Sequence, residues 1–275
     1  MTTKNLKLFG RIFYGVAIAG IGALHFVYND RFRGVLSAVN PDPRWAAPIL
    51  YFFAVYFLIS GILIALGKKL RATSAILAWV LLLFILFGHL PVRLTTPQEL
   101  GAYTNVLKMC AFIGGALFIC WDNRSETIPN NFVAGLTRLA PLAKYFFCIM
   151  LLVFGIDHFV YVDFVTSLVP KYMPVPIFWT YLTGVALFGA GISILLNIRV
   201  RMVAQLLAFM LFVWVFAVHL TLAIKHPEWN AGENITATFQ CLAFTGIALT
   251  VASLAKSGVE IERSLETTDV VQPKI

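Results

Sequence analysis

The sequence predicts an all-α polytopic membrane protein whose eight transmembrane helices form two tandem, parallel repeats of four helices. Three observations predict this fold. The 275 residues are 60% apolar and only 12% charged, which is outside the composition of soluble domains. Eight apolar windows are each long enough to cross a hydrocarbon core of about 30 Å. Landmarks of the first half of the chain recur in the second half.

The eight windows each contain about 20 residues, which is the length that a helix needs to span a bilayer. They lie near 8–28, 46–66, 72–91, 103–121, 140–161, 177–197, 202–224 and 235–255. The first window follows basic residues, as a signal peptide does. No small-residue cleavage site precedes the polar residues 28–30, so we expect a retained helix.

The internal repeat is clearest at residues 22–30, GALHFVYND, which return as GIDHFVYVD at 155–163. At a shift of 133 residues, His25, Pro41 and Pro43 match His158, Pro174 and Pro176, and Trp45 and Trp179 each follow the proline pair. At a shift of 130 residues, Gly61, Arg71 and His89 match Gly191, Arg201 and His219. A three-residue deletion in the second helix of the later half reconciles the shifts. Because four helices return the chain to its starting side, the repeat is parallel rather than inverted.

The repeat divides the chain into four segments. Residues 1–121 and 139–255 are the two four-helix units, and the polar stretch 122–138 is a cytoplasmic linker. Residues 256–275 form a charged cytoplasmic tail that we expect to be loosely ordered. On the outer face, the proline motifs NPDP and MPVP predict loops of extended backbone, with Trp45 and Trp179 at the membrane interface.

Basic residues are distributed unequally between the two sides of the predicted membrane. The side that carries both termini has 14 lysines and arginines, and the other side has six. By the positive-inside rule, both termini face the cytoplasm, and we expect a bacterial inner membrane. The net charge of +8 then follows from topology, so no nucleic-acid partner is predicted.

The candidate ligand-binding residues are four repeated histidines and one acid: His25, His89, His158, His219 and Asp157. His25 and His158 lie near the outer ends of first helices, and His89 and His219 near those of third helices. Ionisable groups inside a membrane are candidates for function, so we expect each pair to face the bundle interior and share a site. The structural alternative is that each histidine bonds water or a carbonyl group at the interface.

Asp157 has no acidic counterpart in the first half, where Leu24 takes its place. Burial of its carboxylate requires a partner, and His219 is the candidate. The alternative is an acid that reaches outer water. For Lys108, in the fourth helix, we expect a side chain that extends to the outer interface, and for His226 an inert position in an exposed loop.

Other chemistry has little support in the sequence. The histidines have no Cys, Asp or Glu at ligand spacing, so no metal site is predicted, and a haem between two histidines is only weakly indicated. Catalytic motifs such as G-x-S-x-G, H-E-x-x-H and the P-loop do not occur. We interpret the four cysteines as buried apolar residues of the helices: Cys110, Cys120, Cys148 and Cys241.

The pattern G-x-x-H-F at 22–26 and 155–159, with the run FVTSLVPKYMPVPIFWTYLTG at 164–184, resembles the DoxX-like membrane family. The match covers each half separately, as if two such units were fused across about 8–255; the first-half loop FRGVLSAVNPDPRW departs from the usual pattern. The resemblance implies a four-helix bundle in each half. It also implies that some relatives take part in thiosulfate–quinone oxidoreduction and that others have accessory or assembly roles.

Three functions therefore remain open. The first is a non-catalytic membrane protein with an accessory or assembly role that binds a lipid, a quinone or a protein partner. The second is a membrane subunit of a quinone-linked oxidoreductase, in which the histidine pairs hold haem or quinone. The third is a small-molecule transporter, which the scarcity of charge along the helices disfavours.

Overall fold

The computed structural model describes residues 1–28, 43–90, 103–229 and 232–255. These residues form helices and turns, and none of them lies in a β-strand. Eight helical spans are long and apolar enough to cross a membrane. The all-α class and the integral membrane character predicted from the sequence are therefore confirmed.

The helices of the first half occupy the first four predicted windows. They are α1 (Thr3–Val27), α3 (Pro43–Leu66), α4 (Leu70–Leu83), which continues into the π-helix η2 (Phe84–His89), and α6 (Thr104–Asp122). The loop that holds the NPDP motif lies mostly outside the described residues.

The helices of the second half occupy the other four windows. They are α8 (Ala143–Val160), the short α9 (Val162–Ser167), α10 (Pro176–Leu195), α11 (Val200–Trp214), which continues through the π-helix η5 (Val215–Leu220) into α12 (Thr221–Lys225), and α13 (Glu233–Leu254). The loop between α8 and α10 thus contains a short helix, α9, which the sequence did not predict and which precedes the prolines of that loop. The predicted tail, 256–275, lies outside the described residues.

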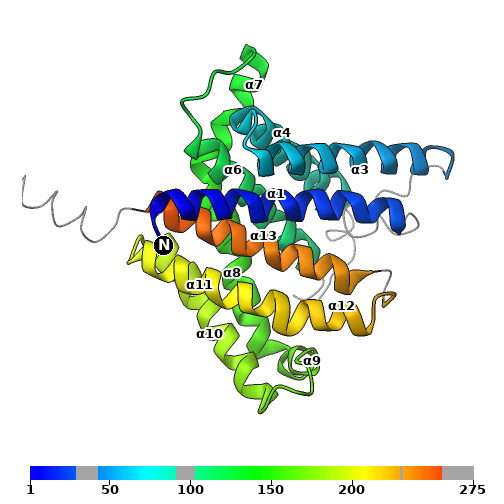
Figure 1. Ribbon diagram of the computed structural model, residues 1–275, viewed down its shortest axis with the longest axis vertical. Helices are drawn as coiled ribbons and strands as arrows, with labels where there is room; N and C mark the ends of the chain where they lie inside the picture. The colour runs from blue at the N-terminus through cyan, green and yellow to red at the C-terminus, as the bar shows by residue number, and fades with distance from the viewer. Residues whose placement is uncertain (29–42, 91–102, 230–231, 256–275) are drawn as a thin grey trace, which may run out of the picture.

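The helices interleave across the midpoint of the chain. α1 packs against α3 on one side and α13 on the other, and α8 packs in the same way against α10 and α6 (Figure 1). α6 and α13 also contact each other. They are the most buried spans, with 67% and 61% of their apolar windows buried against 28% for Val200–Lys225. The first helix of each half therefore packs on the last helix of the other half.

Small residues allow these helices to approach closely. A Cβ atom added to Gly61 would lie 2.3 Å from the backbone nitrogen of Ala19 and 2.5 Å from the carbonyl oxygen of Gly15, so α1 and α3 touch backbone to backbone. At the crossing of α1 and α13, a Cβ on Gly246 would lie 2.6 Å from the carbonyl oxygen of Gly10. Such contacts are how helices associate where lipid supplies no hydrophobic drive.

The two turns that enter α4 and α11 have the same backbone conformation. Lys69 and Arg199, the residues just before the helices, are left-handed, with φ of 49° and 44°. The preceding helices end in matching hydrogen bonds, from Lys68 N to Leu63 O and from Ile198 N to Ser193 O, both 2.9 Å. Gly67 and Asn197 supply the positive φ that ends each helix.

The connector between the halves is more ordered than a polar linker suggests. It contains the helix α7 (Asn131–Leu136) and the 3₁₀-helix η4 (Thr137–Leu142). The indole Nε1 of Trp79 donates to the carbonyl oxygen of Leu136 (2.9 Å), which fixes α7 beside α4. The composition of the connector did not predict this hydrogen bond, because the donor, Trp79, lies on α4.

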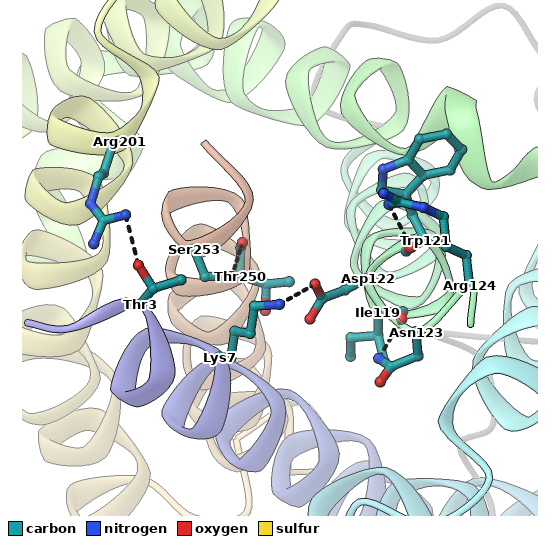
Figure 2. A network of polar contacts seen from close by, with 10 residues as sticks. All are labelled: Thr3, Lys7, Ile119, Trp121, Asp122, Asn123, Arg124, Arg201, Thr250 and Ser253. Carbon is teal, nitrogen blue, oxygen red and sulfur yellow. Dashed lines mark hydrogen bonds and ion pairs between the residues drawn. The ribbon is translucent and has the colours of Figure 1, made fainter. Parts of the chain in front are cut away.

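Polar contacts join the helices at the end that carries the N-terminus. The ammonium of Lys7 pairs with the carboxylate of Asp122 at 2.6 Å, which ties α1 to α6 (Figure 2). The guanidinium of Arg201 donates to Thr3 Oγ1 at 3.0 Å, which ties α11 to the start of α1. The basic ends of α1 and α11 and the C-terminal end of α6 therefore lie together.

The outward faces of the peripheral helices are apolar. Their most exposed large side chains include Phe52, Phe87, Val185, Leu206 and Phe209. A lipid environment accepts such a surface, and water does not. The four cysteines are free; Cys120, Cys148 and Cys241 are buried and Cys110 is half-buried, as predicted.

Candidate functional site at the outer helix ends

His25 and His158 make the same contact in the last turns of α1 and α8. In each ring, Nδ1 lies 2.6 Å from the carbonyl oxygen four residues earlier, Ile21 for His25 and Phe154 for His158. A carbonyl oxygen only accepts, so the proton of a neutral ring is on Nδ1 and Nε2 carries the lone pair. A carbonyl partner is what the structural alternative predicted for each histidine. The lone pair of Nε2 is of the kind that accepts a hydrogen bond or binds a metal.

His89 and His219 both lie in π-helical turns, the two that occur among the described residues. His89 is the last residue of η2 and is 1% exposed, whereas His219 is half-buried in η5. A π-turn widens the helix and is frequent at functional sites. The repeated histidines of the third helices therefore share a distortion as well as a position in the sequence.

The carbonyl groups of η5 have side-chain donors. Thr221 Oγ1 donates to the carbonyl oxygen of Phe216 at 3.1 Å, and the Tyr172 hydroxyl donates to that of Ala217. The ammonium of Lys225 lies 6.0 Å from the centre of the Tyr172 ring. The loop between α9 and α10 is thus anchored on the helical turn that contains His219.

The second helix of each half contacts both helices that carry histidines. The ring of Phe57 lies 6.4 Å from that of His25 and 5.9 Å from that of Phe84, the first residue of η2. In the second half, Trp214 Nε1 donates to Thr183 Oγ1 of α10 at 3.1 Å. Phe57 therefore lies next to His25 and next to η2, the helical turn that ends at His89. A direct approach of the two imidazoles within each half stays a prediction.

Asp157 does not have the partner that the sequence suggested. Its Oδ1 atom is buried and accepts no hydrogen bond from the described residues. No ion pair joins it to His219 in this part of the chain. A buried carboxylate oxygen without a donor is costly, so Asp157 remains a candidate to bind a ligand that donates a hydrogen bond.

Lys108 pairs with Glu233 across the central helices, at 3.1 Å between Nζ and Oε1. The sequence predicted a lysine that reaches the interface without a protein partner, and it missed Glu233. That residue begins α13, so only the packing of α6 on α13 brings it to Lys108.

These side chains can bind but do not form a metal centre. Among the described residues, no group of three or more His, Cys, Asp or Glu side chains could hold a metal ion. Imidazole Nε2 atoms and a carboxylate oxygen within an apolar surround suit a ligand with a small polar head and an apolar body. The fold and these side chains thus define a polytopic helical membrane protein with polar binding groups near one membrane face.

Comparison with known proteins gives one match. Residues 147–253 are similar to the family described as Domain of unknown function (DUF8561). The matched region runs from α8 through α13 and covers less than half of the chain. No curated protein and no solved structure matches the chain.

Proposed function

We propose that this chain is a non-catalytic integral membrane protein of the DoxX-like type, with an accessory or assembly role in which it binds a lipid, a quinone or a protein partner. The observation that carries the proposal is the recurrence of one arrangement: a histidine fixed through Nδ1 at the end of a first helix, and a second histidine in a π-turn. Two such arrangements supply hydrogen-bond acceptors within an apolar protein, which suits the binding of a partner that has a donor group.

Two tandem four-helix units are part of this proposal. The shared turn geometry before α4 and α11, the shared histidine contacts and the two π-turns support them. The family match supports them too, because residues 147–253 lie within the second unit, 139–255. The units differ from independent bundles, since α1 and α8 each pack on the last helix of the other unit.

The proposed location is a bacterial inner membrane with both termini in the cytoplasm. The excess of basic residues at one set of helix ends supports this orientation. Those ends are also where Lys7 and Arg201 make contacts between helices.

A second candidate function is a subunit of a quinone-linked oxidoreductase, with histidine pairs that hold haem or quinone. The tautomer of His25 and His158 favours it, because Nε2 is the atom that would bind a haem iron or accept a hydrogen bond from a quinol. The two candidates differ in what the purified protein contains.

The experiment that tests the proposal is a visible spectrum of the purified full chain, with chromatography of its lipid extract. The accessory function predicts no Soret band and no quinone that is reduced and reoxidised during turnover. A Soret band that is lost on His158→Ala, but kept on His226→Ala, would contradict it and establish the oxidoreductase function. His226 is a suitable control because its ring lies in an exposed loop.

A further inference from the structure

A pocket of about 680 Å³ opens at the opposite end of the helices from the histidines. Three basic residues line it, Lys144 at the start of α8 and Arg199 and Arg201 at the start of α11. Much of the remaining wall is apolar and includes Phe118 and Leu254. None of the lining residues is acidic.

The equivalent turn of the first half shows which group this backbone binds. There the N–H of Arg71 donates to the carboxylate oxygen Oε2 of Glu126 at 2.9 Å, and its guanidinium donates to the carbonyl oxygen of Glu126 at 3.0 Å. Arg71 and Arg201 occupy the same place after the matched residues Lys69 and Arg199. One copy of the turn is therefore closed by an anionic oxygen from the connector.

The second copy of the turn has no such anion among the described residues. The Arg201 guanidinium donates instead to the neutral hydroxyl of Thr3. Arg201 takes part in none of the ion pairs that the described residues form. Three cations thus surround an opening where the first half places a carboxylate.

We propose that this pocket binds the phosphate headgroup of an anionic phospholipid, with an acyl chain against its apolar wall. This inference rests on the proposed function, which names lipid as one class of partner. It specifies that the lipid is an anionic phospholipid. Phosphate accepts several charge-assisted hydrogen bonds, which suits a cluster of arginine and lysine. Basic pockets between transmembrane helices bind anionic headgroups in this way. The apolar wall adds contacts that a free phosphate ion cannot use.

The test measures binding of phosphatidylglycerol to the full chain in detergent, by native mass spectrometry and by the rise in thermal midpoint. Phosphatidylcholine and inorganic phosphate are the comparison ligands. We expect phosphatidylglycerol to bind about tenfold more tightly than phosphatidylcholine, and the difference to shrink as salt rises. The double variant Arg199→Gln/Arg201→Gln should lose this preference.

A matched control removes two charges from the first-half turn, where Glu126 already binds Arg71. Lys68→Gln/Lys69→Gln should keep the preference, because both side chains are exposed at the equivalent turn of the first half. Lys144→Gln is a second test variant, since it leaves the contact between Arg201 and Thr3 intact and avoids loss of folding. It should weaken phosphatidylglycerol binding severalfold.

Several outcomes would overturn the lipid assignment. They are equal binding of the two lipids, full binding by both pocket variants, or protection by inorganic phosphate as strong as that by phosphatidylglycerol. Binding that appears only after removal of residues 256–275 would assign the pocket to the carboxylates of the charged tail of the chain itself. His226→Ala, in the exposed loop at the far end of the helices, should not affect this assay. The spectrum and lipid extract that test the proposed function do not depend on this pocket, so failure here is distinguishable from failure of the proposed function.

Discussion

Tyr14 of α1 and Phe147 of α8 lie at the same point of two helix crossings. A Cβ on Gly246 of α13 would lie 2.6 Å from the backbone nitrogen of Tyr14, and one on Gly114 of α6 would lie 2.9 Å from that of Phe147. Both side chains are fully buried. They differ in one atom, the Tyr14 hydroxyl, which donates to the carbonyl oxygen of Phe112 at 2.6 Å.

The first prediction concerns that hydroxyl. Tyr14→Phe should lower the free energy of unfolding by about 1 kcal/mol, because it removes one buried hydrogen bond and keeps the ring. The measurement is the unfolding midpoint in mixed detergent micelles. The reverse change, Phe147→Tyr, should cost about 1–3 kcal/mol, since it adds an atom to a closed site. Equal stability of Tyr14→Phe and the natural chain would show that the hydroxyl makes no such bond.

The second prediction uses two glycines in corresponding helices. Gly61→Ala should destabilise the protein by about 1–3 kcal/mol, because its Cβ would lie 2.3 Å from the Ala19 nitrogen and push α3 away from α1. Gly189→Ala is the control, since no atom lies within 4 Å of a Cβ there and alanine favours the helix. Thermal midpoints of the two variants give the comparison. Equal midpoints would mean that α1 and α3 do not approach as described.

The spans, their order and the all-α class could be predicted because hydropathy over about 20 residues is a local property. The packing of α1 on α13 could not, because it depends on Gly10 meeting Gly246 across more than 200 residues. In retrospect, the clue was the spacing of small residues in α1 and α13. It shows that a close contact exists but does not identify the partner helix.

The candidate site was predicted in its residues and less well in its contacts. The repeat selected His25 and His158, and both make the same bond. The π-turns around His89 and His219 have no recognisable signal, since FILFGH and VFAVHL share only their apolar character. Among the described residues, Asp157 does not pair with His219, the partner expected from another helix, because such a bond depends on the relative rotation of the two helices.

The third prediction concerns the ion pair between Lys108 and Glu233. Lys108→Met or Glu233→Gln alone leaves one charge unpaired, so the two single variants together should lose more free energy of unfolding than the double variant does. The coupling free energy should be about 0.5–3 kcal/mol. The Lys7–Asp122 pair is the comparison. Its lysine side chain is 45% exposed against 15% for Lys108, so we expect weaker coupling there. Additive effects at Lys108 and Glu233 would contradict the pairing.

The fourth prediction concerns topology. Single cysteines that replace Lys4 and Lys274 should react with an impermeant thiol reagent only after the membrane is permeabilised, because both termini are assigned to the cytoplasm. Lys171→Cys, exposed in the loop between α9 and α10, should react in intact cells and serves as the outer control. Labelling of position 4 or 274 in intact cells would reverse or break the assigned orientation.

The last prediction returns to the repeated histidines. His158→Ala removes the Nδ1 bond to Phe154 and should lower the free energy of unfolding by about 1 kcal/mol. His219→Ala removes the half-buried imidazole of η5, and we expect both variants to reduce ligand binding. His226→Ala should change neither. The double variant His158→Ala/His219→Ala tests the shared site directly. If both rings bind one ligand, the double variant will lose less binding free energy than the two single variants lose in sum. The reason is that the second substitution removes an interaction that the first has already broken. Strict additivity would place the two histidines in separate sites.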